Sequence, residues 1–272
     1  EFRRVLFRSR EIAKLTDDEP RHALHLRSLA ADFLARGIGA ATAVLAAQHG
    51  WSIAVNYAHN RAAADAVVAR IHGAGGRAMA VQADVGDEAQ IMRMFNTVDA
   101  ELGRLSGLVN NAGVVDVTAN VKNQSWARWE RMMRINVLGS FACAREAVRR
   151  MSTAHGGEGG SIVNVSSAAA RIGSPGQYVD YAAAKSAIDA FTIGLAKEVA
   201  AEGIRVNAVR PGLIDTDIHA SGGLPNRVRD LAHGVPMQRG GTADEVAQAI
   251  VWLLSDAASY TTMSLMDISG GR

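Results

Sequence analysis

A tyrosine and a lysine four positions apart, Tyr181 and Lys185 in the segment YAAAK, have the spacing and side chains needed for acid/base chemistry. On a helix, positions i and i+4 share one face, so the phenol and the ammonium can point into the same cleft. A phenol has a pKa of about 10, and a neighbouring cation lowers it. The pair is therefore predicted to transfer protons, although the same spacing also occurs on ordinary solvated helix faces.

A hydroxyl is expected close to this pair, at the end of the strand SIVNVSS. Ser167 is the last residue of that run. In open parallel α/β sheets, ligands bind beyond the carboxyl ends of the strands. Ser166 is the alternative, and either serine could instead cap the following turn.

Small and polar residues end other strands of the same predicted sheet. The run LVNNAG carries Asn110, Ala112 and Gly113, where a flat ligand could approach the backbone closely, and QADV places Asp84 at another strand end. Asn136, in INVLGSF, lies inside a helical region although asparagine is a poor helix former. Its side chain could bond to nearby backbone, or it could mark a helix distortion that holds a water.

The elements that must position these residues alternate along the chain. Apolar runs rich in β-branched residues alternate with amphipathic stretches, which predicts βαβ units and one doubly wound, Rossmann-like α/β domain with a parallel sheet. Strands are expected at 52–57, 77–85, 107–111, 161–167, 204–212 and 264–268, and helices at 38–50, 59–72, 87–102, 125–151, 181–203 and 243–254.

The first 35 residues do not fit this pattern. They carry seven basic and six acidic residues with no sustained period, and EFRRVLFRS is also the translation of a sequencing-library adaptor. Residues 1–35 are therefore predicted to be a non-native leader and 36–272 the domain, the alternative being a natural basic extension.

Bulk composition narrows the class of partner. The net charge of +2 offers no broad attraction for nucleic acid or anionic lipid, so a small-molecule ligand is expected. The single cysteine, Cys143, cannot form an internal disulfide and is expected to be a buried residue on a helix. Because no apolar run approaches the roughly 18 residues needed to span a bilayer, and no signal peptide is visible, the chain is predicted to be cytoplasmic.

Taken together, the motifs resemble the short-chain dehydrogenase/reductase family, in particular bacterial glucose dehydrogenases and 3-oxoacyl-[acyl-carrier-protein] reductases. The matching pieces are RGIGAATA, ADV, NNAG, INVLGSF, IVNVSS, YAAAK and VRPG, in the family's order, over residues 36–272. The resemblance implies an NAD(P)-dependent oxidoreductase that moves hydride between a nicotinamide and a carbonyl or secondary alcohol. A catalytically silent, nucleotide-binding or oligomer-forming homologue is the alternative.

The resemblance also implies catalytic roles. Tyr181 would be the general acid/base, Ser167 would hold the substrate oxygen, Lys185 would lower the tyrosine pKa and bind the nicotinamide ribose, and Asn136 would position a relay water. Thirteen residues separate Ser167 from Tyr181, one more than the family usually has. An insertion within GSPGQYVDY keeps Ser167 as the expected residue.

The same resemblance assigns cofactor contacts. No acidic residue that would bind the ribose 2′-hydroxyl of NAD lies between Ser52 and Ala64; NYAHNR is there instead, which favours NADP(H) over NAD(H). The expected cofactor residues are Arg36, Ile38 and Gly39 at the pyrophosphate, Asn56, Tyr57 and Arg61 near the 2′-phosphate, Asp84 and Val85 at the adenine, Asn110, Ala112, Gly113, Tyr181 and Lys185 along the ribose, and Pro211, Gly212, Ile214 and Thr216 at the carboxamide.

Two departures from the family pattern stand out. Phe33 takes the place of an early glycine, so the first strand is expected to be defective or replaced and cofactor affinity to collapse, and Met263 takes the place of a glycine before the last strand. The resemblance further implies a homotetramer built on the two long helices and the last strand. Substrate specificity is expected from residues 213–227, Gln177 and Tyr178, without identifying the substrate.

Overall fold

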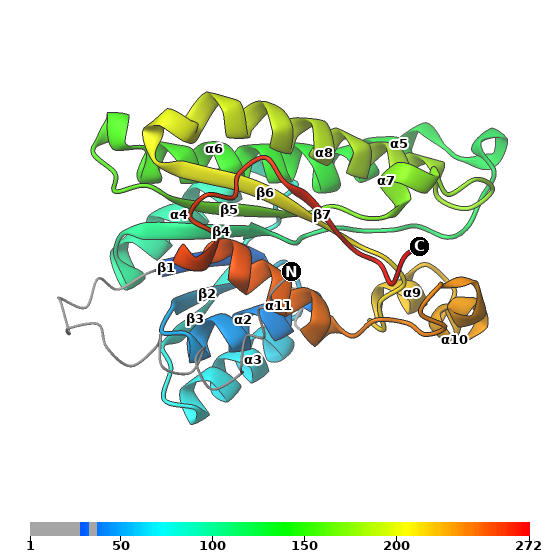
Figure 1. Ribbon diagram of the computed structural model, residues 1–272, viewed down its shortest axis with the longest axis horizontal. Helices are drawn as coiled ribbons and strands as arrows, with labels where there is room; N and C mark the ends of the chain where they lie inside the picture. Colours follow the sequence, from blue (N-terminus) through cyan, green and yellow to red (C-terminus); the bar gives the residue numbers. More distant parts are fainter. Residues whose placement is uncertain (1–27, 33–36) are drawn as a thin grey trace, which may run out of the picture.

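The structure, a computed structural model, describes residues 28–32 and 37–272 and contains one seven-stranded parallel sheet (Figure 1). The strand order is β3-β2-β1-β4-β5-β6-β7, so the chain winds outward in both directions from the centre. The strands are β1 (Ser28–Asp32), β2 (Ser52–Tyr57), β3 (Ala78–Gln82), β4 (Leu105–Asn110), β5 (Gly160–Val165), β6 (Ile204–Pro211) and β7 (Leu265–Ile268). The predicted fold class, α/β with a doubly wound parallel sheet, is confirmed.

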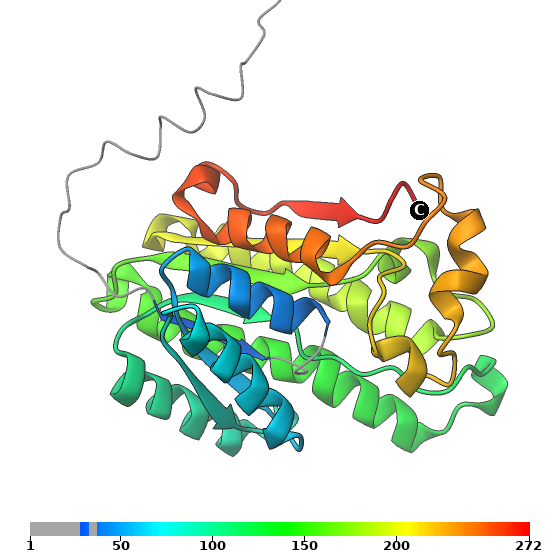
Figure 2. The same cartoon turned by 90° about the horizontal axis from the view of Figure 1, so that it is seen from below.

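Helices cover both faces of the sheet: α2, α3 and α11 lie on one face, and α4, α6 and α8 on the other (Figures 1 and 2). The helices are α2 (Ile38–Gln48), α3 (Arg61–Gly73), α4 (Glu88–Leu102), α5 (Trp126–Met133), the π-helix η3 (Arg134–Gly139), α6 (Ser140–Met151), α7 (Ala169–Ile172), α8 (Val179–Val199), α9 (Ile218–Ser221), α10 (Arg227–Leu231) and α11 (Ala243–Leu254). Short 3₁₀ turns are η2 (Val121–Asn123), η4 (Thr153–His155), η5 (Ala200–Glu202), η6 (Ala232–Gly234) and η7 (Asp256–Ala258).

The period of two in the strands explains the two cores. Within β2, Ile53 and Val55 pack into the core beneath α2, α3 and α11, whereas Ala54 packs into the core beneath α4, α6 and α8. Because both faces of β2 are buried, its sequence is apolar almost throughout and does not alternate between polar and apolar residues. Cys143 is buried in α6, as predicted. No helix in the described part of the chain is long and apolar enough to cross a membrane.

The first strand of the sheet is present. Residues 28–32, inside the stretch assigned to a leader, form β1 at the centre of the sheet, paired in parallel with β2 and β4. The leader is thus not wholly outside the fold, because the gap between β2 and β4 is filled by this short run, although its register against β4 shifts between Ser28 and Leu29. The foreign origin of the leader stays a prediction, and Phe33 and Arg36 lie outside the described residues.

The last strand is entered through a left-handed residue. Met263 has a φ of 62°, and its amide donates to the Val206 carbonyl oxygen at 2.7 Å. Positive φ favours glycine because other residues clash there. The departure noted at Met263 therefore falls at a strained backbone position, yet β7 still pairs with β6.

Candidate active site

A cavity of about 520 Å³ opens at the carboxyl ends of the central strands, where ligands bind in sheets of this kind. Its walls come from the start of α2, the loops after β4, β5 and β6, and the first turns of α8. It brings Ser167, which follows β5, together with Tyr181 and Lys185 on α8.

The side chain of Ser167 lies within hydrogen-bonding reach of the Tyr181 phenol, whose pKa it lowers. Ser167 Oγ also accepts a hydrogen bond from the Ala169 amide at 3.1 Å, which fixes the hydroxyl over the turn after β5. Burial raises the pKa of Tyr181 to about 12, and the Ser167 bond opposes that rise. The phenol is therefore fully protonated at neutral pH, the form needed to donate a proton.

The structure separates the two candidate serines. Ser166 is buried, and its Oγ donates to the main-chain oxygen of Lys185 at 3.1 Å. Ser167 is the serine beside the tyrosine phenol, which agrees with the interpretation of the extra residue in GSPGQYVDY as an insertion. Ser166 instead ties β5 to α8.

Lys185 lies one turn after Tyr181 with its side chain almost wholly buried. Its Nζ donates to the Val165 carbonyl oxygen at 2.7 Å and lies 5.7 Å from the centroid of the Tyr181 ring. Burial lowers the pKa of Lys185 to about 8, while Asp189 raises it. The ammonium therefore faces the tyrosine ring and titrates close to neutral pH, but burial and Ser167, not Lys185, set the direction of the Tyr181 pKa.

Asn136 falls in the π-helix η3, so the predicted distortion of the long helical region is present. Its side chain is fully buried and clamps Val114: Oδ1 accepts from the Val114 amide at 2.9 Å, and Nδ2 donates to the Val114 oxygen at 3.0 Å. A Cβ on Gly113 would lie 2.8 Å from Asn136 Oδ1 and 3.5 Å from Lys185 Nζ. Only glycine allows Asn136 and Lys185 to approach the loop after β4 so closely.

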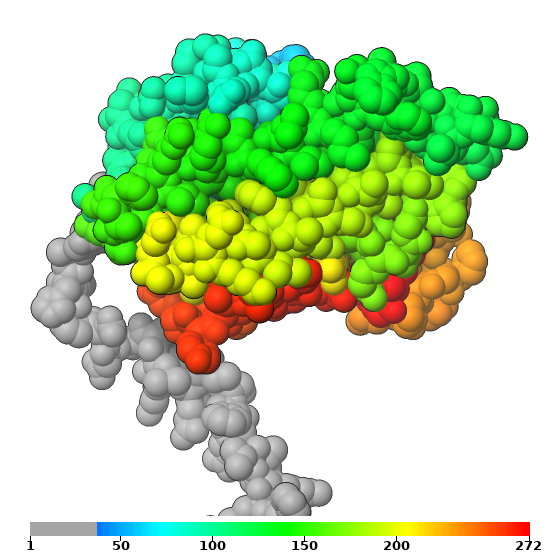
Figure 3. All heavy atoms as spheres, turned by 90° about the horizontal axis from the view of Figure 1, so that it is seen from above, coloured from blue at the N-terminus to red at the C-terminus, as the bar shows by residue number. Residues whose placement is uncertain are grey.

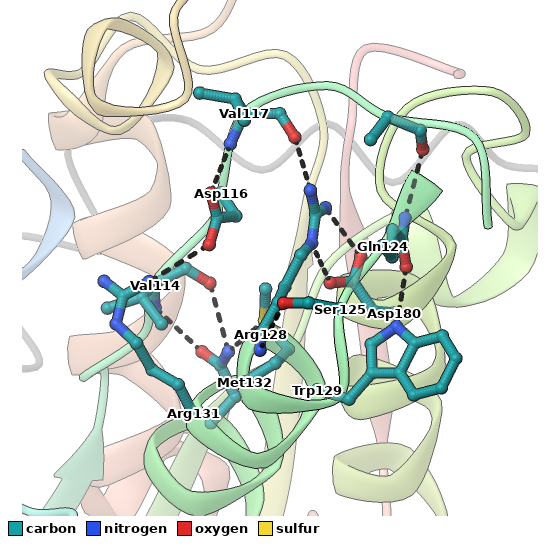
Figure 4. Close-up of polar contacts among 12 residues, drawn as sticks. Val114, Asp116, Val117, Gln124, Ser125, Arg128, Trp129, Arg131, Met132 and Asp180 are labelled. Atoms are coloured by element: carbon teal, nitrogen blue, oxygen red, sulfur yellow. Dashed lines mark hydrogen bonds and ion pairs between the residues drawn. The ribbon is translucent and has the colours of Figure 1, made fainter. Parts of the chain in front are cut away.

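An ion pair missed by the sequence analysis holds the same loop from the other side (Figure 4). Arg128, on α5, contacts Asp180 through Nε at 2.7 Å and Nη2 at 3.1 Å, and both side chains are nearly inaccessible. Its Nη1 donates to the Val117 oxygen at 2.6 Å. Asp180 directly precedes Tyr181, so Arg128 connects the first turn of α8 to the loop. No motif links the two, which are 52 residues apart.

The start of α2 has the features of an anion site. Gly37, the N-cap, has a φ of 85°, and a Cβ there would lie 3.1 Å from Thr216 Cγ2. No side chain caps the helix, and no acidic residue lies in its first turn, so the first amides and the helix dipole are available to a phosphate. Ile38 lines the cavity, and Gly39 follows it within the buried part of α2.

The predicted cofactor residues divide into two groups. Those that line the cavity are Ile38, Gly113, Tyr181, Lys185, Pro211, Gly212, Ile214 and Thr216. The second group, which does not line it, consists of Gly39, Asn56, Tyr57, Arg61, Asp84, Val85, Asn110 and Ala112.

Several members of the second group are engaged in structural bonds. Asn56 Nδ2 donates to the oxygens of Val81 and Ala83, and Asn110 Nδ2 donates to Asn164 Oδ1 at 2.9 Å. Arg61 points to the surface, where it pairs with Asp65 at 3.3 Å. Tyr57 and Val85 are buried core residues, and Asp84 Oδ1 accepts from the Gly86 amide.

Cavity residues that the sequence analysis missed include Asn60, Ala63, Asn111, Arg131 and Arg272. Asn60 had a usable signal, because an asparagine before a helix is a common N-cap; its Oδ1 accepts from the Ala63 amide at 3.1 Å. No pattern in the sequence indicates that Arg131 and Arg272 lie in the cavity. They reach the cavity only through tertiary packing.

A doubly wound sheet with a helix N-terminus and a left-handed glycine at its switch point is the arrangement found in proteins that bind nucleotide cofactors. The profile of a family described as Enoyl-(Acyl carrier protein) reductase matches residues 34–272. The chain belongs to the short-chain dehydrogenase/reductase family and is an NAD(P)-dependent oxidoreductase.

Relatives cover most of the chain. It is 56% identical over 237 residues to the uncharacterized oxidoreductase YgfF of Escherichia coli, covering 87% of this chain and 96% of that protein. It is 37% identical over 237 residues to a 3-oxoacyl-[acyl-carrier-protein] reductase of Synechocystis, covering 87% and 92%. A mutant short-chain dehydrogenase/reductase of Serratia marcescens superposes with a TM-score of 0.82 at 31% identity, covering 92% of this chain and 99% of that one.

Proposed function

We propose that the protein is an NADP-preferring carbonyl reductase or alcohol dehydrogenase that uses Tyr181 as its general acid/base. The observation that supports this most is the meeting of Ser167, Tyr181 and Lys185 in one cavity with the uncapped start of α2. The cofactor, when bound, supplies or accepts the hydride. Gly37, Ile38 and Thr216 would hold it at the phosphate and carboxamide ends.

The chain's own residues handle the proton. In reduction, Ser167 donates a hydrogen bond to the carbonyl oxygen, and the Tyr181 hydroxyl gives that oxygen its proton as the carbon accepts the hydride. The phenolate left behind is stabilised by the Lys185 ammonium. In oxidation, the same phenolate removes the proton of the alcohol. Asn136, whose side-chain amide is used on both sides by Val114, would contribute by holding the loop after β4 beside Lys185.

The lowered pKa of Lys185 predicts how the free enzyme responds to pH. The ammonium is present below about pH 8 and lost above it, so kcat/KM for NADPH in ketone reduction should fall on the alkaline side of that value. Steady-state rates measured at intervals from pH 6 to 10 on the repaired chain described below would check this. Lys185→Met should be slow with no such fall, and a flat profile for the unsubstituted protein would contradict the assignment.

The preference for NADP rests on the missing acidic residue and on Arg61. A bound 2′-phosphate would compete with Asp65 for this exposed guanidinium, and surface pairs of that kind are weak. Arg61→Ala should therefore lower the NADPH/NADH ratio of kcat/KM by roughly 10-fold, as expected for one lost charge-assisted contact. Arg70→Ala, on the same helix, is the control. An unchanged ratio would remove Arg61 from the cofactor site.

A catalytically silent homologue is the competing function, and the altered N-terminal sequence favours it. NADPH oxidation with a panel of ketones and aldehydes distinguishes a reductase from a silent homologue. The assay uses the present chain and a repaired chain, in which the residues before Gly37 are replaced by the glycine-rich start typical of the family. Turnover in the repaired chain supports the proposed reductase. No turnover in either chain favours the silent homologue.

We also propose a cytoplasmic homotetramer. The long helices α5, α6 and α8 form one outer face of the molecule (Figure 3). Leu138 is 59% exposed there, beside the stacked rings of Phe141 and Phe191, whose centroids are 3.8 Å apart. The exposed Leu138 next to these half-buried rings supports association with other copies through this face.

A further inference from the structure

An arginine that forms no ion pair within the described residues lies in the wall of the active-site cavity. Arg227, the first residue of α10, lines the cavity, and its guanidinium carbon lies 5.3 Å from the centroid of the Tyr178 ring. Within residues 28–32 and 37–272, no carboxylate lies within ion-pair distance of it. Arg229, two positions along, pairs with Asp230 at the surface. The guanidinium of Arg227 is therefore available to bind an anionic ligand in the cavity.

Other cations surround Arg227 in this wall. Burial lowers the pKa of Arg227, and the charge of Arg272 lowers it further. Burial also lowers the pKa of His219, where Arg227 and Arg272 add to the effect and Asp215 opposes it. The acidic residue in the lining, Asp217, has a bonding partner of its own, and Arg131 is paired with Asp116 at 3.3 Å. Arg227 and Arg272 thus place two positive charges in the cavity wall, and Asp217 is the acidic residue of the same lining.

Apolar side chains flank this charge. Ile172, Tyr178 and Ile218 line the cavity beside Arg227. A half-buried arginine next to apolar surface gives up part of its hydration, a cost that a bound anion offsets. A ligand with an apolar body and one anionic end would fit both features.

We propose that the carbonyl substrate carries a carboxylate, which Arg227 binds while the reacting carbon faces Ser167 and Tyr181. The inference rests on the proposed function, because it names the class of substrate for that site. The guanidinium offers two parallel N–H donors to a carboxylate, and stacking on Tyr178 holds its plane. Arg272 would add long-range attraction without needing to touch the ligand.

Kinetics with matched acid and ester pairs test this on the repaired chain. For 4-oxopentanoate against its methyl ester, kcat/KM should favour the acid by roughly 30-fold, a ratio expected for one charged arginine contact. Arg227→Gln should remove most of that preference through KM, and Arg227→Lys should remove part of it. Arg229→Gln should leave the ratio unchanged. Equal rates for acid and ester, or a ratio indifferent to Arg227, would overturn the proposal.

Equilibrium binding separates this inference from the proposed function. Hexanoate and hexanamide have the same apolar chain, and calorimetry measures their binding without turnover. Tighter binding of hexanoate that is lost in Arg227→Gln supports the carboxylate site even if no ketone is reduced. No preference for hexanoate, in an enzyme that does reduce neutral ketones, overturns the site and leaves the reductase standing. Thermal melting confirms that each variant is folded.

Discussion

Replacing Tyr181 by phenylalanine should lower kcat/KM for carbonyl reduction by about 10³-fold, the usual size of a general acid contribution, equivalent to roughly 4 kcal/mol of transition-state stabilisation. The substitution removes the only atom that can pass a proton from this side chain and keeps the ring in place. Ser167 and Lys185 remain, but Ser167 would then need to donate a proton from a hydroxyl with no base beside it. Initial rates with NADPH and a reactive ketone give the ratio.

Two controls make this result specific to the phenol. Tyr260→Phe, at a fully exposed position, should leave the rate unchanged. The melting temperature and NADPH affinity of Tyr181→Phe should stay close to those of the parent chain, because the ring still fills the same space. If Tyr181→Phe retains more than about a tenth of the activity, well above the range for a lost general acid, its assigned role is wrong.

Replacing Arg128 by methionine should lower the free energy of unfolding by about 3–5 kcal/mol, the range found when one partner of a buried ion pair is removed. The Asp180 side chain is 2% exposed, so its carboxylate would be left in the interior without its cation. The Val117 oxygen would also lose its hydrogen bond from Nη1. Urea denaturation followed by circular dichroism measures the change.

A double variant distinguishes the pair from its parts. Arg128→Met with Asp180→Leu should be less destabilised than Arg128→Met alone, because no charge is left unpaired. Arg229→Met, which breaks an exposed pair with Asp230, should cost about 0–1 kcal/mol. A loss below about 1 kcal/mol for Arg128→Met would mean that water reaches Asp180 and that the pair behaves like one at the surface.

Much of the fold was predictable because local rules and tertiary structure agree. The alternation at Ile53, Ala54 and Val55 puts side chains into two cores, and Gly203 closes the helical segment with a φ of 77°. Period and turn chemistry act over a few residues, so they can be read from the chain. The central strand was expected to be defective or replaced, because its sequence departs from the family pattern; its pairing with β2 and β4 is a tertiary contact that the local pattern does not reveal.

The candidate site divides in the same way. The approach of Tyr181 and Lys185 follows from helix geometry, and the meeting of Ser167 with Tyr181 follows from the carboxyl-end rule for parallel sheets. The outward direction of Arg61, by contrast, depends on a local choice between Asp65 and a ligand. The Arg128–Asp180 pair joins residues that only tertiary packing brings together, so no spacing in the sequence predicts it.

The most direct test of the central claim, that this cavity transfers hydride from a nicotinamide to a carbonyl, is mass spectrometry of the alcohol formed from a ketone and NADPH dideuterated at C4. We expect one deuterium on the carbinol carbon with the repaired chain, and almost none of that alcohol with Tyr181→Phe. Alcohol without deuterium, or no alcohol although NADPH binds, would contradict the account.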